Sequence, residues 1–454
     1  MLRPRADGLL ESDDPVRFAF MAPRLQGELA PDGRLDLALW GEGRAGAARL
    51  ALPQGPYLYA PNRMTWPGGG LFVAQSAPAI LVRDAGGARV LGPEPLAPAQ
   101  VEAECEAHVR RCDRLPDADP VLRSMVLHGV HAGLSSARQD AHGRFAGLSA
   151  GLGYSAPART YYRDAYWTLP LLEQVAPELI AAEVELLARG VRLDGEAPSG
   201  VTLDPAWQGD SLVHTRPGDW WSDHFDSPLY FALMSGAPTR AVRDRYRALA
   251  GADGLPRKPR HDRDWADNVF RSGLVAYDLG LWFGAFGEGA EAIDAALWRE
   301  NLGWYGDYDG EDHLALDTLT LLRFGATPED KARRVLDACR SLHMPWGVRC
   351  AWPPYARRAD LRAKSAFPGR YHNGGDWPWL DGLYAGELLR RGLPGWRHPL
   401  TRWWETCLAM GWPGAVEHFS PQFGRGSLIQ AWSSLPAAVA LEHRETVLTG
   451  DPAA

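Results

Sequence analysis

The stretch YHNGGDWPWLDG, residues 371–382, combines a loop with the start of a helix. Its Gly-Gly and Trp-Pro pairs interrupt regular helical geometry, so it predicts a loop that leads into a helix beginning near Leu380. Aromatic rings beside carboxylate and amide groups are typical of sugar-binding sites, because a sugar ring lies on an aromatic face while its hydroxyl groups take directed hydrogen bonds. The structural alternative is a Trp-Pro-Trp segment that is simply buried between helices.

Helical periodicity extends from about residue 99 to the end of the chain. Eleven segments carry apolar residues at helical spacing and are separated by Gly- and Pro-rich turns. They are 122–133, 169–189, 228–234, 241–250, 268–286, 291–304, 314–324, 330–342, 380–391, 400–410 and 428–442. No Gly-rich phosphate loop, nucleophile elbow or short repeat interrupts them. We therefore expect a toroid of paired helices, in which one further helix would complete six hairpins and the loops on one face carry the function.

Residues 1–98 have the pattern of β structure instead. Short apolar stretches such as RFAFMA, RLDLALW and AILVRD recur at strand-like spacing between Gly, Pro and Asp turns. The period becomes helical in LAPAQVEAECEAHVRRC, which places a domain boundary at Pro98. The sequence thus predicts a mainly α protein, with a small antiparallel β-sandwich-like domain over residues 1–98 and the helical domain over residues 99–454.

Composition excludes several classes of partner. The 454 residues are 46% hydrophobic and 23% charged, an ordinary soluble balance. The net charge of −8 argues against nucleic acid or an anionic membrane as a partner. No apolar run approaches a membrane span, and the first residues lack the apolar core of a signal peptide. We expect a cytoplasmic protein, whose oligomeric state the sequence does not reveal.

The cysteines give no metal signature. They are Cys105, Cys112, Cys339, Cys350 and Cys407, an odd number without a CxxC pair or a Cys/His ligand spacing. We expect reduced, buried thiols. The carboxylates are scattered and form no ligand set with histidines, so neither a metal nor a cofactor is expected.

The segment YYRDAYWTLPLL, residues 161–172, is the first of five loop segments that carry candidate site residues. Tyr162, Tyr166 and Trp167 are candidate platforms for a sugar ring. Arg163 and Asp164 either bind sugar hydroxyls or simply pair with each other.

The second segment is GDWWSDHFDSPLYF, residues 218–231. Asp226 precedes Ser-Pro and is predicted to cap a helix. Trp220 and Trp221 either line a pocket or pack in the core, and we assign Trp221 to the substrate site.

The third and fifth segments supply a candidate acid and base. In RHDRDWADNVFRSGLVAYDLGLWFGAF, residues 260–286, Asp264 and Asp267 flank Trp265, and one of them is expected to cap the following helix. A carboxylate beside an indole in a partly dry cleft has a raised pKa, as a general acid requires; we prefer Asp267, with Asp264 as the alternative. In GWPGAVEHFSPQFGRGSLIQAWSSLP, residues 411–436, Glu417 lies among aromatic residues. Two such carboxylates are what hydrolysis of a glycosidic bond needs, and they meet only across a closed toroid.

The opening stretch is the fourth segment, and it is expected to form the wall of the sugar pocket. His372, Asn373 and Asp376 are the candidates for orienting hydroxyl groups. Trp377 or Trp379 would support the ring.

In this order the segments resemble the catalytic domain of amylo-α-1,6-glucosidases and of their relatives, which are (α/α)6-barrel glycoside hydrolases and include processing α-glucosidases, trehalases and neutral invertases. YYRDAYWTLPLL is similar to WGRDxWxSLPGLL, DWADN to the TWMDA-type segment of the general acid, and QAWSSLPAAVAL to QAWSxAExLRA. MPWGVRCAWPPY and YHNGGDWPWL resemble PxGLRTLxPxxPxY and YHxGxVWPWL. The resemblance covers most of the chain after about residue 115.

The resemblance implies an (α/α)6 toroid that hydrolyses an α-glucosidic bond of a small oligosaccharide or α-glucoside with inversion. Asp267 would be the acid and Glu417 the base, with Gln430 and Trp432 among the binding residues. An inverting pair lies about 6.5–9.5 Å apart. One departure concerns residues 277–279, Tyr-Asp-Leu, where the family has Glu-Ile-Asn. HNGGDWP also leans toward the HNGGxWP of neutral invertases.

Other functions on the same toroid stay open. A neutral invertase-like or trehalase-like enzyme would hydrolyse a disaccharide, and a phosphorylase would replace the base with phosphate near His372 and Arg425. An epimerase would use two histidines, for which His261, His372 and His418 are available. A sugar-binding protein without catalysis would keep the tryptophans and tolerate loss of either carboxylate.

Overall fold

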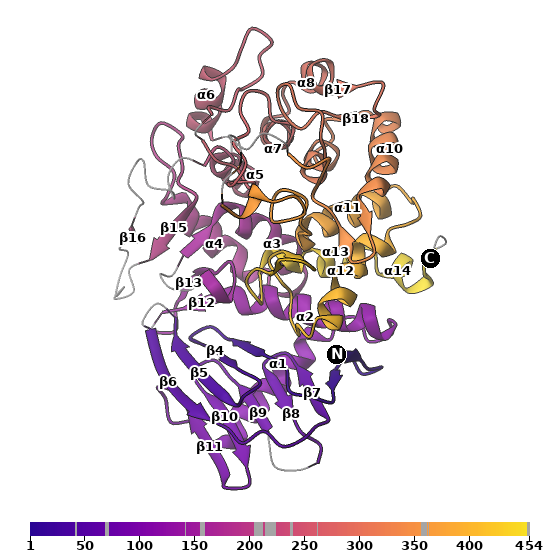
Figure 1. Cartoon of the computed structure of the whole chain (residues 1–454). Coiled ribbons are helices and arrows are strands. Elements are labelled where there is room, and N and C mark those ends of the chain that lie inside the picture. The colour runs from indigo at the N-terminus through magenta and orange to yellow at the C-terminus, as the bar shows by residue number, and fades with distance from the viewer. Residues whose placement is uncertain are drawn as a thin grey trace.

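The computed structural model describes residues 1–40, 43–68, 72–140, 142–154, 159–203, 212–213, 224–236, 239–260, 262–355, 361 and 363–451. Figure 1 shows the strands from the first hundred residues gathered at one end and the helices at the other, with the first two helices between them.

Two antiparallel sheets form the N-terminal end. The larger has the order β1 (Arg3–Pro4), β2 (Leu10–Ser12), β7 (Tyr57–Ala60), β8 (Arg63–Thr65), β9 (Phe72–Gln75), β10 (Ile80–Asp84) and β11 (Gly87–Leu91). The smaller has the order β3 (Phe18–Met21), β4 (Leu25–Leu29), β5 (Arg34–Leu39) and β6 (Gly43–Arg49). In β4 buried and half-buried residues alternate, as in a strand with one face on a core. The rings of Phe18 and Tyr59, 5.2 Å apart, join the sheets, and the predicted antiparallel region is confirmed.

Helices are the main regular elements of the rest of the described chain. They are α1 (Pro98–Cys112), α2 (Pro120–Ser136), α3 (Tyr162–Val175), α4 (Glu178–Ala188), α5 (Ser227–Ser235), α6 (Arg240–Ala248), α7 (Ala276–Phe286), α8 (Ala290–Leu297), α9 (Thr320–Arg323), α10 (Glu329–Ala338), α11 (Pro378–Arg390), α12 (Arg397–Ala409), α13 (Leu435–Glu442) and α14 (Arg444–Thr449). Short 3-10 helices η1 (Leu152–Tyr154), η2 (Leu316–Leu319), η3 (Cys339–Leu342), η5 (Ala363–Ala366) and η6 (Trp432–Ser434) accompany them.

Short strands pair within the loops of the helical part. They are β12 (Ala137–Gln139) with β13 (Phe145–Leu148); β14 (Arg159–Tyr161) with β15 (Gly200–Leu203) and β16 (Leu212–Val213); β17 (Trp298–Arg299) with β18 (Trp304–Tyr305); β19 (Leu314–Ala315) with β22 (Ala351–Trp352); β20 (His343–Met344) with β21 (Gly347–Val348); and β23 (Phe419–Ser420) with β24 (Gly424–Arg425).

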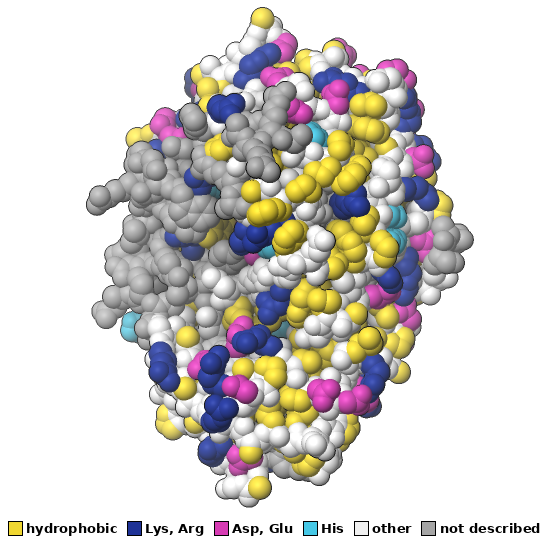
Figure 2. Space-filling model, in the orientation of Figure 1, with side chains coloured by type: hydrophobic (Ala, Val, Ile, Leu, Met, Phe, Trp, Pro, Cys, Tyr) yellow, Lys and Arg dark blue, Asp and Glu magenta, His cyan; other side chains and the backbone are white. Residues whose placement is uncertain are grey.

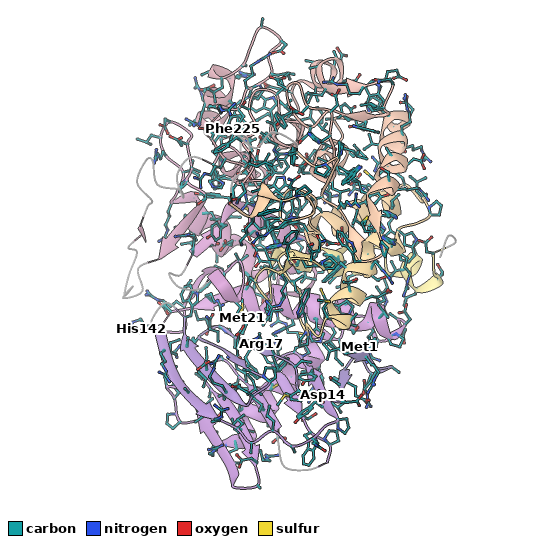
Figure 3. All side chains as sticks on the ribbon, viewed as in Figure 1. Met1, Asp14, Arg17, Met21, His142 and Phe225 are labelled. Carbon is teal, nitrogen blue, oxygen red and sulfur yellow. The ribbon has the colours of Figure 1, made fainter. Side chains whose placement is uncertain are left out.

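Alternate helices contact one another in sequence order. α3 contacts α5, α5 contacts α7, α7 contacts α9, α9 contacts α11, α11 contacts α13, and α13 contacts α3. The intervening helices α4, α6, α8 and α12 lie against members of this series. Side chains fill the space between the helices, as Figure 3 shows around Phe225, whose ring lies 4.8 Å from that of Tyr246. These contacts support the predicted toroid, whose closure stays a prediction.

Two predicted helices differ in extent from the observed ones. The segment 169–189 divides between α3 and α4 because the helix ends at Val175 and Pro177 stands at the N-cap of the next one. The segment 268–286 becomes helical only at Ala276, and the N-cap is Val275. The prediction that Asp264 or Asp267 caps this helix is therefore wrong.

A buried ionic cluster holds the loop that precedes α7. Arg271 lies 2.9 Å from carboxylate oxygens of Asp264 and Asp307 and also pairs with Asp317. Lys258 Nζ lies 2.6 Å from Asp264 Oδ2, and all five side chains are buried. Although burial opposes ionisation, the charges of Arg271 and Lys258 lower the pKa of Asp264. The cluster replaces the hydrogen bonds that a helix would supply to this segment.

All five cysteines are buried and none forms a disulfide, as expected. Across the parts of the chain that the structure describes, every helix is too short or too polar to span a membrane.

Glu183 of α4 allows a test of how a buried carboxyl affects stability. It accepts hydrogen bonds from the backbone N–H of Leu148 (3.1 Å) and from the hydroxyl of Thr160. Burial raises its pKa from 4.5 to about 7, although both hydrogen bonds lower it. Because the folded state then binds the proton more tightly than the unfolded chain, the free energy of unfolding falls as pH rises from about 4.5 to about 7.

We predict that Glu183→Gln removes this dependence. The amide oxygen accepts from Leu148 and the amide N–H donates to Thr160, so the variant should gain on the order of a few kcal/mol over the parent protein at pH 8 but little at pH 5. Urea unfolding at both pH values measures the difference. Glu185→Gln on the same helix, where the side chain is 76% exposed, is the control and should show no such dependence. An equal effect of Glu183→Gln at both pH values would contradict the prediction.

Candidate active site

Nine predicted site residues line one cavity of about 60 Å³. They are Arg163, Asp164, Trp265, Asp267, His372, Trp377, Glu417, Gln430 and Trp432. Ala150, Tyr161, Ser199, His224 and Tyr371 complete the described lining. Segments more than 250 positions apart in the chain therefore meet at one point, as the sequence pattern required. The face seen in Figure 2 carries Lys and Arg side chains at its centre, bordered by hydrophobic ones.

The loop that contains Glu417 is held by a hairpin. The backbone N–H of Glu417 donates to Ser427 O (2.9 Å), and the N–H of Ser427 donates to Glu417 Oε2 (3.1 Å). Strands β23 and β24 lie between these two residues. A Cβ at Gly426 would lie 2.3 Å from Glu417 Oε2, so only glycine allows the carboxylate to occupy this position. Glu417 is 5% exposed.

Arg163 is the cation of the site. Its guanidinium lies 3.4 Å from Asp226 Oδ2 and 3.8 Å from Asp164 Oδ2, and it lies over the Trp432 ring at 5.3 Å. The hydroxyl of Tyr277 donates to the same oxygen of Asp226 (3.0 Å). Asp226 stands at the N-cap of α5, as predicted, but its side chain makes no capping hydrogen bond. The prediction of a capping side chain is wrong, because the carboxylate points to Arg163 instead.

Two acidic side chains of the cavity lining, Asp164 and Asp267, have raised pKa values. Burial raises the pKa of Asp164 to about 7, and the charge of Glu417 adds to the effect while Arg163 opposes it. Burial also raises the pKa of Asp267, against the charges of Arg163 and His224. The Asp267 side chain is 14% exposed and accepts a hydrogen bond from Asn268 Nδ2 (2.7 Å). Asp267 therefore stays protonated to a higher pH than an ordinary aspartate, as a general acid requires.

His372 lies between aromatic walls. Its ring is stacked on Trp377 (4.8 Å, 11°) and meets the edge of Trp265 (4.9 Å, 79°). Burial lowers its pKa well below the usual value, and the neighbouring His418 adds to this, so the imidazole is neutral. His372 Nδ1 lies 3.7 Å from Asp267 Oδ1.

Several polar atoms of lining residues are buried without a hydrogen-bond partner among the described residues. They are Arg163 Nε, Ser199 Oγ, His224 Nε2, His372 Nδ1 and Nε2, Gln430 Oε1 and Trp432 Nε1. Each such atom costs roughly 1–3 kcal/mol unless something polar meets it. The set contains both donors, such as Trp432 Nε1, and acceptors, such as Gln430 Oε1, and sugar hydroxyl groups can meet both kinds because each hydroxyl both donates and accepts.

The backbone beside the cavity is strained at two positions. Tyr371 has a φ of 53° and Ile429 a φ of 52°, in the left-handed region that non-glycine residues rarely adopt. Each directly precedes a lining residue, His372 or Gln430. Strain of this kind persists where the surrounding structure fixes a functional geometry.

Seven candidate site residues lie in the described part of the chain but outside the lining: Tyr162, Tyr166, Trp167, Asp264, Asn373, Asp376 and Trp379. The ring of Tyr166 packs 5.0 Å from that of Trp167. Tyr162 and Trp167 face the core, where they donate to Leu187 O (2.7 Å) and to the hydroxyl of Tyr230 (2.8 Å). Asp264 belongs to the ionic cluster around Arg271, which leaves the alternative acid with both oxygens paired.

The other three support the wall from behind. Asn373 donates to Ser365 O (3.0 Å), and Asp376 accepts from the backbone N–H of Val348 (2.9 Å). Trp379 is stacked on Trp432 at 5.5 Å, so one tryptophan backs another. For these three residues the contacts agree with the alternative interpretation of residues 371–382, in which the segment is buried between helices.

Three residues named from the sequence lie outside the described residues: Trp220, Trp221 and His261. His224 and Tyr371 line the cavity although the sequence analysis assigned them no role. The available signal was their place in the sequence, because His224 lies two positions before Asp226 and Tyr371 directly precedes His372.

Comparison with known proteins is informative at the level of structure. No family model and no curated protein sequence matches the chain. A rhamnosidase from Klebsiella oxytoca with rhamnose bound is 13% identical, with a TM-score of 0.54 over 88% of this chain and 76% of that one. A bacterial glucoamylase complexed with acarbose is 11% identical, with a TM-score of 0.53 over 96% of this chain and 82% of that one. The chain shares their fold. At such low identity the likeness says nothing of substrate, and the resemblance to amylo-α-1,6-glucosidases stays a prediction.

Arg163 should be essential for the stability of the site. Arg163→Ala leaves Asp226 buried without its cation, so we predict a loss of about 3–5 kcal/mol in the free energy of unfolding at pH 7. Arg163→Lys keeps the charge and should lose less. Arg192→Ala breaks a pair with Glu196 whose arginine is 37% exposed, and should lose less than about 1 kcal/mol. Urea unfolding of the three variants measures this, and equal losses at positions 163 and 192 would contradict it.

Proposed function

We propose that the protein is a glycoside hydrolase that cleaves an α-glucosidic bond of a small oligosaccharide or α-glucoside with inversion. The observation that carries the proposal is the cavity itself, in which Asp267 and Glu417 come from distant loops and meet aromatic walls and unpartnered polar atoms. The fold shared with a rhamnosidase and a glucoamylase supports the reaction class. An (α/α)6 toroid over residues 99–454, behind a β domain over residues 1–98, is part of the proposal.

The proposed reaction divides the work between two carboxyl groups. Asp267 gives its proton to the glycosidic oxygen as the bond to the anomeric carbon breaks. Glu417 takes a proton from a water molecule, whose oxygen attacks that carbon from the opposite face. The raised pKa of Asp267 suits the donor. The proton that leaves Asp267 is balanced by the one that Glu417 gains, and exchange with solvent restores both groups.

Binding of the sugar falls to the other lining residues. The rings of Trp265, Trp377 and Trp432 offer apolar surface to the C–H faces. His372 and Gln430 offer the unpartnered nitrogen and oxygen atoms for hydroxyl groups. The small cavity favours a single sugar ring over an internal segment of a chain.

The two-carboxyl mechanism applies equally to other sugars and bonds. Trehalase-like or neutral invertase-like hydrolysis of a disaccharide uses the same two groups, and the fold shared with a rhamnosidase adds α-rhamnosides to the substrates worth testing. An epimerase that uses His372 and His418 is disfavoured, because burial lowers the pKa of His418 to about 3 and that of His372 well below its usual value, so neither of these two histidines is a proton donor near neutral pH.

We predict that Asp267→Asn and Glu417→Gln each lower kcat by at least about 10²–10⁴-fold, because each removes one proton transfer. Turnover is measured by release of reducing sugar from maltose, isomaltose, trehalose, sucrose, glucosylglycerate and an aryl α-rhamnoside. Asp253→Asn and Glu405→Gln make the same chemical changes at ion-paired positions outside the cavity and should keep full activity. Full turnover in either cavity variant discards the assignment, and turnover that requires phosphate makes the protein a phosphorylase.

The stereochemistry gives an independent prediction. NMR of the first product should show the β-anomer from an α-linked substrate, because water attacks from the face opposite to the departing group. Release of the α-anomer would mean a retaining mechanism, with Glu417 or Asp267 as a nucleophile.

The pH profile should report on Asp267. Since the acid acts in its protonated form and burial raises its pKa, kcat/KM should stay high above the ordinary carboxyl range and fall as pH rises through the raised value. With an aryl glycoside whose leaving group needs no protonation, Asp267→Asn should regain rate and lose this descending limb. A descending limb that persists in the variant would assign it to another group.

A further inference from the structure

A second cluster of potential ligands lies between α1 and α2. His108 and Cys112 are one turn apart on α1, and His131 and Ser135 are one turn apart on α2, so each pair shares a helix face. Nε2 of His108 lies 2.9 Å from Nδ1 of His131 and 3.6 Å from Sγ of Cys112. The three ligand atoms all lie within 4.8 Å of one another.

Hydrogen bonding alone does not satisfy this cluster. Nδ1 of His131 has two polar atoms at 2.9 Å, Nε2 of His108 and Oγ of Ser135, but it carries one hydrogen or one lone pair. His131 and Cys112 are buried, which makes an imperfect hydrogen bond costly. None of these residues belongs to the lining of the candidate active site.

We propose that His108, Cys112 and His131 bind one zinc ion. Two imidazoles and one thiolate are a ligand set that zinc prefers among the common divalent metals. With usual zinc bond lengths and tetrahedral angles, the nitrogen atoms lie about 3.3 Å apart and nitrogen and sulfur about 3.5 Å apart. The observed 3.6 Å already fits, and the 2.9 Å contact needs to open by only about 0.4 Å. Binding displaces the thiol proton of Cys112.

A fourth ligand has room to approach. A cavity of about 290 Å³ adjoins the cluster and is lined by His108 and Ser135, together with Glu104 and Arg111. Its volume admits water, and the Ser135 hydroxyl already lies close to His131 Nδ1. The ion would therefore complete its shell with water or with Ser135.

The position of the ion gives it a structural role. α1 contacts strands β9, β10 and β11, whereas α2 contacts α3, α12 and α13. Two ligands on α1 and one on α2 tie the β end of the molecule to the helical end. Because the unfolded chain does not hold these groups together, zinc would stabilise the folded protein in proportion to its affinity.

The sequence did not indicate this site, because its three ligands lie in two different segments. The i, i+4 spacing of His108 and Cys112 matches no CxxC pattern, and the third ligand follows 19 positions later. The proposal replaces two expectations from the sequence, that Cys112 is only a buried thiol and that the protein binds no metal.

Cobalt provides a direct test on the full-length protein after removal of metals with a chelator. We expect one Co²⁺ per chain, with the charge-transfer absorption of a thiolate ligand and the ligand-field bands of a tetrahedral ion. Addition of Zn²⁺ should bleach both and raise Tm by about 3 °C at a hundredfold excess over Kd. Absence of thiolate absorption in the parent protein overturns the proposal and leaves a hydrogen-bonded cluster only.

Variants separate this site from adventitious binding. Cys112→Ser should abolish the charge-transfer band, and His108→Gln, at a partly exposed position, should weaken Co²⁺ binding at least 100-fold. Cys105→Ala is the matched control, because Cys105 lies on the same helix but its thiol faces Asn62 O (3.5 Å). If Cys112→Ser does not fold, Co²⁺ binding by His108→Gln alone tests the proposal. Unchanged binding in His108→Gln, or loss of the band in Cys105→Ala, overturns the proposal.

Discussion

Arg271 is buried, and three carboxylates surround it. Among its described residues, the segment from Lys258 to Val275 has no helix or named strand, so these ion pairs and isolated bridges such as that between Lys258 and Gly273 together fix where its backbone lies. The indole of Trp265 also donates to Asp317, a member of the same cluster (2.5 Å). The position of Asp267 thus depends on a charge balance several residues away. Such a cluster adds little net stability compared with apolar side chains, but loss of one member leaves uncompensated charges, which specifies a single conformation.

Buried polar contacts also hold the other walls of the cavity, but different groups make them. A hairpin and a glycine hold Glu417, and Gln430 Nε2 donates to Asp164 (3.1 Å) across more than 250 positions of sequence. The helices provide the frame, and buried polar contacts within the loops provide the geometry. Among the described residues, Asn373 and Asp264 behind the cavity have hydrogen-bond partners, whereas cavity atoms such as His372 Nε2 and Trp432 Nε1 have none.

Periodicity made the helices predictable and the loops much less so. Amphipathic spacing identified α2, α5, α11 and α12 to within a few residues, because burial of one face is a local property of sequence. Asp226 stands at a helix N-cap without a capping hydrogen bond from its side chain, and Asp264 caps no helix, because a carboxylate before an apolar run has the same local pattern whether it caps a helix or pairs with an arginine. Which side chain in the first turn of α3 or in the loop before α11 faces the cavity has no signal in the sequence pattern, so Tyr162 and Asp376 could not be separated from Arg163 and His372. The domain boundary at Pro98 and the closure of the toroid stay predictions.

The left-handed backbone of Tyr371 and Ile429 has a consequence for protein engineering. Glycine would relieve the torsional penalty at either position, but it would also free the chain beside His372 and Gln430. Selection for heat resistance alone would then favour variants that lose the left-handed conformation, and selection for turnover would favour variants that keep it. Thermal stability and catalytic activity therefore place opposite demands on Tyr371 and Ile429.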